Sequence, residues 1–247
     1  MKAIAITDVG QKRHTNQDYV YASPSPVGKL PNLFIVADGM GGHKAGDYAS
    51  RFVVEKMVEF LRTCEDPNPV SAVNKGIRLV NRRLLDESMN HAEMAGMGTT
   101  LVAAFVSGNT LYVANVGDSR LYIINQGIQQ ITRDHSLVEE MASRGELSRD
   151  SDNYLAGKNI ITRAVGVTYT VEPDFFELEL RQGDYILMCS DGLTNMVDDA
   201  CIRQIVQEPV GLRKKGDKLI QTANDNGGRD NIAVILIDSE ISEVSTC

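Results

Sequence analysis

The chain has 247 residues, of which 43% are hydrophobic and 23% charged, a composition typical of a globular protein with a substantial core. The formal net charge is −8 and no basic face is visible, which argues against a nucleic-acid-binding protein. No apolar run approaches the ~20 residues that a membrane-spanning helix needs. Residues 1–10 lack the pattern of a signal peptide, so we expect a cytoplasmic protein with no membrane partner.

The cysteines agree with that location. None forms a Cys-x-x-Cys pair, and none has a histidine at zinc-binding spacing. We therefore expect free thiols in a reducing compartment. The residues are Cys64, Cys189, Cys201 and Cys247.

In the first half of the chain, apolar patterns predict strands and then helices. The run at 33–37 is apolar throughout, which is typical of a strand buried on both faces. The glycine-rich stretch after it leads to a helix for which Asp47 is a candidate cap. The expected elements are a strand at 3–7, a buried strand at 33–37 ending at Asp38, a helix after Asp47 and a helix around 73–84.

In the second half, short strands joined by tight turns predict antiparallel pairing. Residues 145–159 are polar and weakly patterned, so we interpret them as a mobile surface segment. The expected strands are 99–106, 110–116, 120–124, 175–180, 185–189 and 232–237, and the expected helices are 136–144, 200–207 and 212–224. Strands that are apolar throughout need cover on both faces, which favours two stacked antiparallel sheets with helices outside, an α+β fold.

Four acidic segments stand out because each is expected to put an aspartate at a bend, and three of them adjoin a buried strand. A lone Asp-Gly pair is usually only a turn. Several such sites at strand ends form a set of hard oxygen ligands, which Mg²⁺ and Mn²⁺ prefer, and their mutual repulsion requires a cation. The segments are Asn16-Gln17-Asp18, Asp38-Gly39, Asp191-Gly192 and Asp230-Asn231.

These acids suggest two-metal phosphoester chemistry, in which the ions activate a water and no amino-acid nucleophile is needed. The chain has neither the Cys-x₅-Arg loop of cysteine phosphatases nor a Walker A glycine loop. Arg13 lies five residues before Asp18, and its guanidinium offers two parallel donors that match two phosphate oxygens.

The ordered motifs make the chain resemble the protein phosphatase 2C (PPM) family, the metal-dependent protein serine/threonine phosphatases, and in particular its bacterial members. The matching stretches follow the family order along nearly the whole chain. They are residues 13–18, 36–43, 98–100, 117–120, 161–166, 190–192 and 228–231.

The resemblance implies a site for two Mn²⁺ or Mg²⁺ ions and hydrolysis by attack of a water that bridges them. Asp38 would bridge the ions, and the Gly39 carbonyl would bind the second. Asp191 and Asp230 would complete the first ion's ligands. Asp18 would act through metal-bound waters.

The resemblance also implies that Arg13 grips the substrate phosphate and that Asp118, with Asp191, holds a third, weaker ion. It implies a single catalytic domain over residues 1–247, built as a four-layer α/β/β/α sandwich. The segment at about 145–159 falls where the family carries its flap, a loop beside the active site that is linked to substrate choice.

The sequence departs from the family at the position after the bridging Asp-Gly pair. Many members have a histidine there, proposed as a general acid, and this chain has Met40. His43 is equally open to a catalytic role and to a packing role. Gln17 stands where relatives often have glutamate.

We predict a monomeric phosphatase that removes phosphate from serine or threonine of proteins and opposes a bacterial Ser/Thr kinase. One alternative is a non-catalytic phosphoprotein-binding module, which the complete set of acids disfavours. Another is a phosphatase for an anti-sigma-factor antagonist, which the lack of a sensor domain disfavours. Mn²⁺ calorimetry would separate the binding module from the enzyme.

Overall fold

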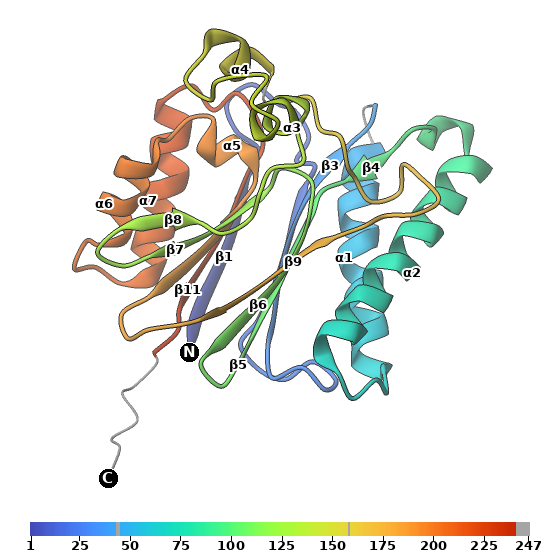
Figure 1. The fold of residues 1–247 in the computed structure, drawn as a ribbon, viewed down its shortest axis with the longest axis horizontal. Helices are drawn as coiled ribbons and strands as arrows, with labels where there is room; N and C mark the ends of the chain where they lie inside the picture. Colours follow the sequence, from blue (N-terminus) through green and yellow to red (C-terminus); the bar gives the residue numbers. More distant parts are fainter. Residues whose placement is uncertain (43–44, 158, 241–247) are drawn as a thin grey trace.

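Two antiparallel sheets stack face to face and helices cover their outer faces (Figure 1). The structure is a computed structural model that describes residues 1–42, 45–157 and 159–240. This arrangement confirms the predicted α+β class and its layers. The first sheet has the order β1 (Lys2–Asp8), β11 (Ile232–Asp238), β10 (Tyr185–Cys189), β7 (Arg120–Ile124) and β8 (Ile128–Gln130). The second has the order β2 (Asp18–Ser23), β3 (Leu33–Met40), β5 (Leu101–Ser107), β6 (Thr110–Val116) and β9 (Asp174–Glu179), with β4 (Gly98–Thr99) paired to β3.

The helices fall into an outer pair on each side and a group at one end of the sandwich (Figure 1). Helices α1 (Ala45–Thr63) and α2 (Pro69–Asn90), followed by the 3₁₀ turn η1 (Ala92–Met94), lie outside the second sheet. Helices α6 (Asp199–Val206) and α7 (Leu212–Asp225) lie outside the first. The short helices α3 (Leu137–Ser143), α4 (Asp152–Gly157) and α5 (Asp191–Thr194) gather at the upper end.

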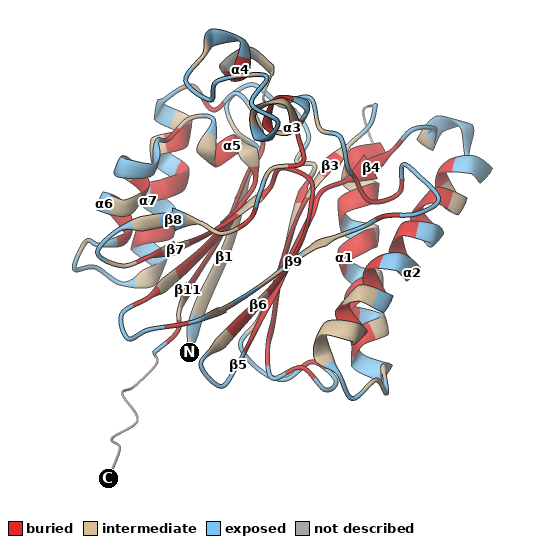
Figure 2. Ribbon diagram, in the orientation of Figure 1, coloured by how far each residue is buried: buried red, intermediate tan, exposed pale blue. Residues whose placement is uncertain are grey.

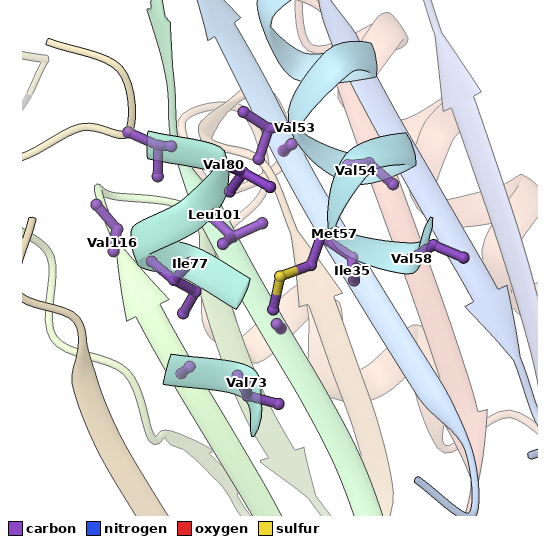
Figure 3. Close-up of a cluster of buried hydrophobic side chains, with 14 of the residues drawn as sticks. Ile35, Val53, Val54, Met57, Val58, Val73, Ile77, Val80, Leu101 and Val116 are labelled. Atoms are coloured by element: carbon purple, nitrogen blue, oxygen red, sulfur yellow. The ribbon is translucent and has the colours of Figure 1, made fainter. Parts of the chain in front are cut away.

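Strand β3 shows why an unbroken apolar run is needed. Successive side chains of a strand point to opposite faces. Ile35 therefore packs under α1 and α2 (Figure 3), whereas Phe34 and Val36 pack between the sheets. Figure 2 shows the same contrast across the whole molecule, with buried strands at the centre and helices exposed on their outer faces.

Three details differ from the sequence predictions. Asp38 is not at a bend but inside β3, which runs on to Met40 because β4 pairs with its end. Asp18 and Asp191 are not at bends either: they are the first residues of β2 and α5. Asp47 is not a cap but lies within the first turn of α1 and pairs with Arg51. The predicted strand 99–106 is divided into β4 and β5.

The polar segment 145–159 contains a helix, α4, that the sequence pattern did not reveal. Six residues are too few for a helical period to be visible. A tertiary contact supports it instead: the Tyr154 hydroxyl donates a hydrogen bond of 2.8 Å to Glu139 on α3. Cys64, Cys189 and Cys201 are free thiols. Within the described ranges, no helix is long and apolar enough to cross a membrane.

Candidate metal centre

Acidic side chains from both sheets meet in one pocket of about 340 Å³ at the upper end of the sandwich. Asp38 lies on β3 of the second sheet, and Asp118 lies in the turn that leads from β6 to β7 of the first sheet. Asp191 comes just after β10 and Asp230 just before β11, both strands of the first sheet. The pocket residues that the sequence predicted are Arg13, Asp38, Gly39, Asp118, Asp191 and Asp230. Segments far apart in the chain therefore converge as the two-metal hypothesis requires.

Asp18 lies beneath this pocket rather than on its wall. It is buried and stands directly opposite Asp38 in the antiparallel β2–β3 pair. Opposite residues in such a pair have their Cβ atoms roughly 5 Å apart on one face of the sheet. The register of two strands therefore sets the spacing of these carboxylates.

The backbone of Asp38 is fixed by two neighbouring threonines. The Asp38 amide donates to Thr100 Oγ1 at 2.9 Å, and the Asp38 carbonyl accepts from the Thr100 amide at 2.8 Å and from Thr99 Oγ1 at 2.9 Å. Thr100 Oγ1 is also 2.8 Å from the hydroxyl of Ser119. Thr99, Thr100 and Ser119 are all buried, so the backbone of Asp38 is held in place before any ligand binds.

Ser190 joins the two sheets next to the acids. Its hydroxyl donates to Asp18 Oδ2 at 2.6 Å and accepts from the Ala233 amide at 2.9 Å. Asp191 follows as the first residue of α5, where the positive end of the helix favours a carboxylate. The hydroxyl thus links an acid of the second sheet to the strand ends of the first.

Asn231 fastens the loop that carries Arg13. Its side chain is buried, accepts from the Gln17 amide, and donates to the carbonyls of Val9 and Thr15, each at 2.9 Å. Arg13 itself is half-exposed and pairs with Asp230 at 2.8 Å. The loop is therefore held rigidly while the guanidinium remains accessible at the pocket.

Burial raises the pKa of several acids, and their mutual repulsion adds to the effect. The pKa of Asp18 rises to about 7, that of Asp118 to about 7 and that of Asp191 to about 6. The pKa of Asp38 lies well above its usual range because burial is reinforced by Asp18 and Asp191. Carboxylates crowded in this way retain protons unless a cation neutralises them.

The donor set fits divalent cations. Asp18 Oδ1 is buried and accepts no hydrogen bond in the described part of the protein, so an acceptor oxygen lacks a partner beside the pocket. Within the same residues, no group of three or more His, Cys, Asp or Glu side chains lies close enough together to hold one ion by itself, so backbone carbonyls and waters would have to complete the ligands. Mg²⁺ keeps several waters when bound, and a pocket with room for water suits such an ion better than a closed cage.

Met40, which follows the Asp38-Gly39 pair, lines the pocket. Its thioether has no proton to donate. His43 lies outside the described residues. Gln17 also lines the pocket.

Sequence reasoning gave no role to Ser190 or Asn231, although both adjoin predicted ligands in sequence. Serine next to Asp191 and asparagine next to Asp230 were visible, but their partners are remote in the chain. The signal in the sequence that could have indicated their supporting role is that each is a polar residue directly before or after a predicted ligand.

A family model described as Protein phosphatase 2C matches residues 9–232. A serine/threonine phosphatase stp of Listeria innocua is 40% identical over 96% of this chain and 95% of its own. The crystal structure of the serine/threonine phosphatase Stp1 from Staphylococcus aureus has a TM-score of 0.87 at 36% identity, covering 96% of this chain and 95% of its own. The catalytic domain of the phosphatase PstP, solved in complex with two manganese ions, has a TM-score of 0.82 at 31% identity, covering 95% and 96%.

Two stacked antiparallel sheets with an acidic pocket at one end are the architecture of a metal-dependent phosphatase. The chain belongs to the protein phosphatase 2C family, whose matched bacterial relatives are protein serine/threonine phosphatases. It is an enzyme of that class.

Proposed function

We propose that this pocket hydrolyses phosphoserine and phosphothreonine in proteins with two Mn²⁺ or Mg²⁺ ions. The observation that carries the proposal is the convergence of Asp38, Asp191, Asp230 and Arg13 on one pocket. Two ions held there would supply a water that is deprotonated near neutral pH and would stabilise charge on the phosphoryl group.

In this proposal the acids divide the ligand work. Asp38 would be a ligand of both ions, and the Gly39 carbonyl would be a ligand of the second. Asp191 and Asp230 would hold the first ion. Asp18, which is buried, would accept hydrogen bonds from metal-bound waters. Asp118 and Asp191 would hold a third ion.

Arg13 binds and orients the substrate. It is accessible at the pocket and already pairs with a carboxylate, so two phosphate oxygens can replace that partner with the same geometry. The serine or threonine oxygen that leaves must gain a proton. Because Met40 has none to give, water in the pocket supplies it.

We extend the proposal to the setting of the enzyme. Residues 1–247 act as one catalytic unit, monomeric and cytoplasmic, whose phosphoprotein substrates are made by a Ser/Thr kinase. The free thiols support the location. The kinase rests on analogy with bacterial relatives. Phosphoproteomics after deletion of the gene tests it: kinase-dependent phosphosites should rise.

The decisive experiment compares Asp38→Asn and Asp191→Asn with the unaltered enzyme on p-nitrophenyl phosphate in saturating Mn²⁺. We expect roughly a 10³-fold loss or more in kcat, because the lost transition-state stabilisation is several kcal/mol. Calorimetry should show weaker or fewer Mn²⁺ sites in both variants. Arg13→Ala should mainly raise KM.

Asp217→Asn on α7 is the matched control, since this exposed carboxylate pairs only with Arg213 in the described part of the chain and lies outside the pocket. It should retain full activity and metal binding. Turnover within threefold of normal in Asp38→Asn would exclude the proposed centre. Poor Mn²⁺ binding together with no phosphatase activity in the unaltered protein would favour the binding module.

A further inference from the structure

Apolar side chains project into solvent beside the pocket. Met89 and Tyr169 are the most exposed large hydrophobic residues in the described part of the chain, at 63% and 62%, and Val167 is 48% exposed. Met89 and Tyr169 touch each other: the tyrosine hydroxyl lies 3.9 Å from the methionine sulfur. Clustered exposure of this kind is typical of a binding surface, whereas single exposed residues are common.

One member of this patch, Val167, lies close to the pocket residue Met40. Met40 lines the pocket and pairs with Gly98 across β3 and β4. A Cβ on Gly98 would lie 3.6 Å from Met40 Cε and 2.7 Å from Val167 Cγ2. Both side chains therefore border the same spot. We call Met40, Val167, Tyr169 and Met89 the apolar rim.

The protein holds the rim in place with a buried polar side chain. Asn81 on α2 is 1% exposed; it accepts from the Gly166 amide at 2.7 Å and donates to the Thr168 carbonyl at 2.9 Å. The guanidinium of Arg82 lies 5.0 Å from the centre of the Tyr169 ring. In Figure 1 the gold segment leading into β9 reaches the upper end of α2. These contacts hold the segment so that Val167 and Tyr169 remain exposed to solvent and do not pack into the core.

We propose that the apolar rim binds an apolar side chain next to the phosphorylated residue of the substrate protein. The inference rests on the proposed function. A substrate with its phosphate in the pocket continues at about 3.3–3.6 Å per residue. Because Met40 of the rim itself lines the pocket, the residues that flank the phosphorylated one pass beside the rim. We therefore assign the rim to the segment of the substrate that flanks the phosphorylated residue.

The test uses pairs of phosphothreonine peptides that differ only in having leucine or serine at one position from three before to three after the phosphothreonine. The unaltered enzyme should show a kcat/KM about five- to tenfold higher for leucine at one or two of these positions, because partial burial of one side chain has that effect. At the other positions, the ratio of kcat/KM for the leucine peptide to kcat/KM for the serine peptide should be near one.

Tyr169→Ser and Val167→Ser should reduce that ratio toward one. The ratio is measured within each variant, so a general loss of activity does not alter it. Val210→Ser is the matched control, because Val210 is also exposed, at 39%, but lies in the α6–α7 connection. It should keep the unaltered ratio.

A ratio near one at every position in the unaltered enzyme, or a ratio unchanged in both rim variants, would overturn the inference. A change in oligomeric state by light scattering in the rim variants, without a change in the ratio, would overturn it too and would assign the rim to a second copy of the chain. Failure of the proposed function is distinct, since p-nitrophenyl phosphate would then not be hydrolysed with Mn²⁺.

Discussion

The acidic pocket and the neighbouring α3–α4 segment (residues 137–157) are held by different forces. Around the pocket, the buried side chains of Thr100, Ser190 and Asn231 bind backbone or carboxylate groups of remote strands. In the α3–α4 segment, Glu139 binds two partners from the same segment: the Tyr154 hydroxyl and Arg149, whose side chain is 57% exposed. Local stability follows buried contacts, so the pocket is the more rigid region.

This difference separates two tasks. Metal ligands must keep their geometry, and they sit on strands whose supports are buried. A segment beside the pocket that rests on a solvent-accessible ion pair can rearrange at little cost in free energy. We therefore expect changes in the pocket supports to affect the chemistry, and changes in the α3–α4 segment to affect local stability.

Among the residues that support the pocket without lying at the metal site, Asn231→Ala should have the largest effect. It removes three hydrogen bonds that fix the loop of Arg13, and a misplacement of about 1 Å can cost roughly 10²-fold in rate. Steady-state kinetics with p-nitrophenyl phosphate should show kcat/KM lower by about 10²-fold. Asn226→Ala, which changes an exposed asparagine bonded to Met196, is the control. Activity within threefold of normal in Asn231→Ala would show that the loop of Arg13 keeps its conformation without these hydrogen bonds.

Metal removal should change the pH dependence of stability. Folding raises the pKa of Asp18 and Asp118 to about 7 and that of Asp191 to about 6, so the folded metal-free protein binds more protons than the unfolded chain. The contribution of these three acids to stability is then full below about pH 4 and falls as pH rises to about 7. We expect Tm of the metal-free protein to fall over this range.

Saturating Mn²⁺ should reverse that trend near neutral pH, since cations stabilise the ionised acids. At 100 times Kd the added stability is about 2.7 kcal/mol. Differential scanning calorimetry with and without a chelator measures both quantities. A metal-free Tm that rises between pH 5 and 7 would contradict the pKa directions in the pocket.

A smaller effect is expected for Ser190→Ala. The change leaves Asp18 and the Ala233 amide without their shared hydroxyl, which costs about 1–3 kcal/mol of stability. Because groups that orient metal ligands influence affinity by about 10–100-fold, Mn²⁺ affinity should fall about tenfold. Ser239→Ala, a buried serine bonded to the Asp184 carbonyl, is the control and should keep the normal affinity.

The smallest effect is expected in the α3–α4 segment. Burial pushes the pKa of Glu139 up, but hydrogen bonds from Arg149 and Tyr154 outweigh it, and the pKa lies below its ordinary value. Glu139→Gln should therefore lower stability by less than about 1 kcal/mol, and the loss should disappear as pH falls below about 4. Hydrogen exchange should be faster in α4 than in β3 in both proteins. Equal protection would contradict the comparison.

Long, strongly patterned elements were predictable. The apolar run 33–37 became the core of β3, and the spacing of Val73, Ile77 and Val80 gave the buried face of α2. Short elements were not. Strand β8 has three residues and α4 has six, which is too short for a hydrophobic period to show. Each is identified by a contact with a neighbouring element, β8 with β7 and α4 with α3.

The strand that begins at Asp18 shows a different limit. Its side chains alternate between two cores, with Tyr19 and Tyr21 under α1 and Val20 between the sheets. Both faces carry apolar groups, so alternation of polar and apolar residues is absent. Only pairing with β3 identifies the strand and sets Asp18 opposite Asp38.

The sequence by itself determined the chemistry on offer: acids beside buried strands, one arginine near the first of them, and the order of motifs that marks the family. Tertiary structure decided which acids lie opposite one another, which serine and asparagine hold them, and that Val167 and Tyr169 face solvent beside the pocket. Residue type fixes what a side chain can bind. Its position depends on strand register and on contacts between segments remote in the chain, such as those of Asn231 with Val9 and Thr15, which are 222 and 216 residues away.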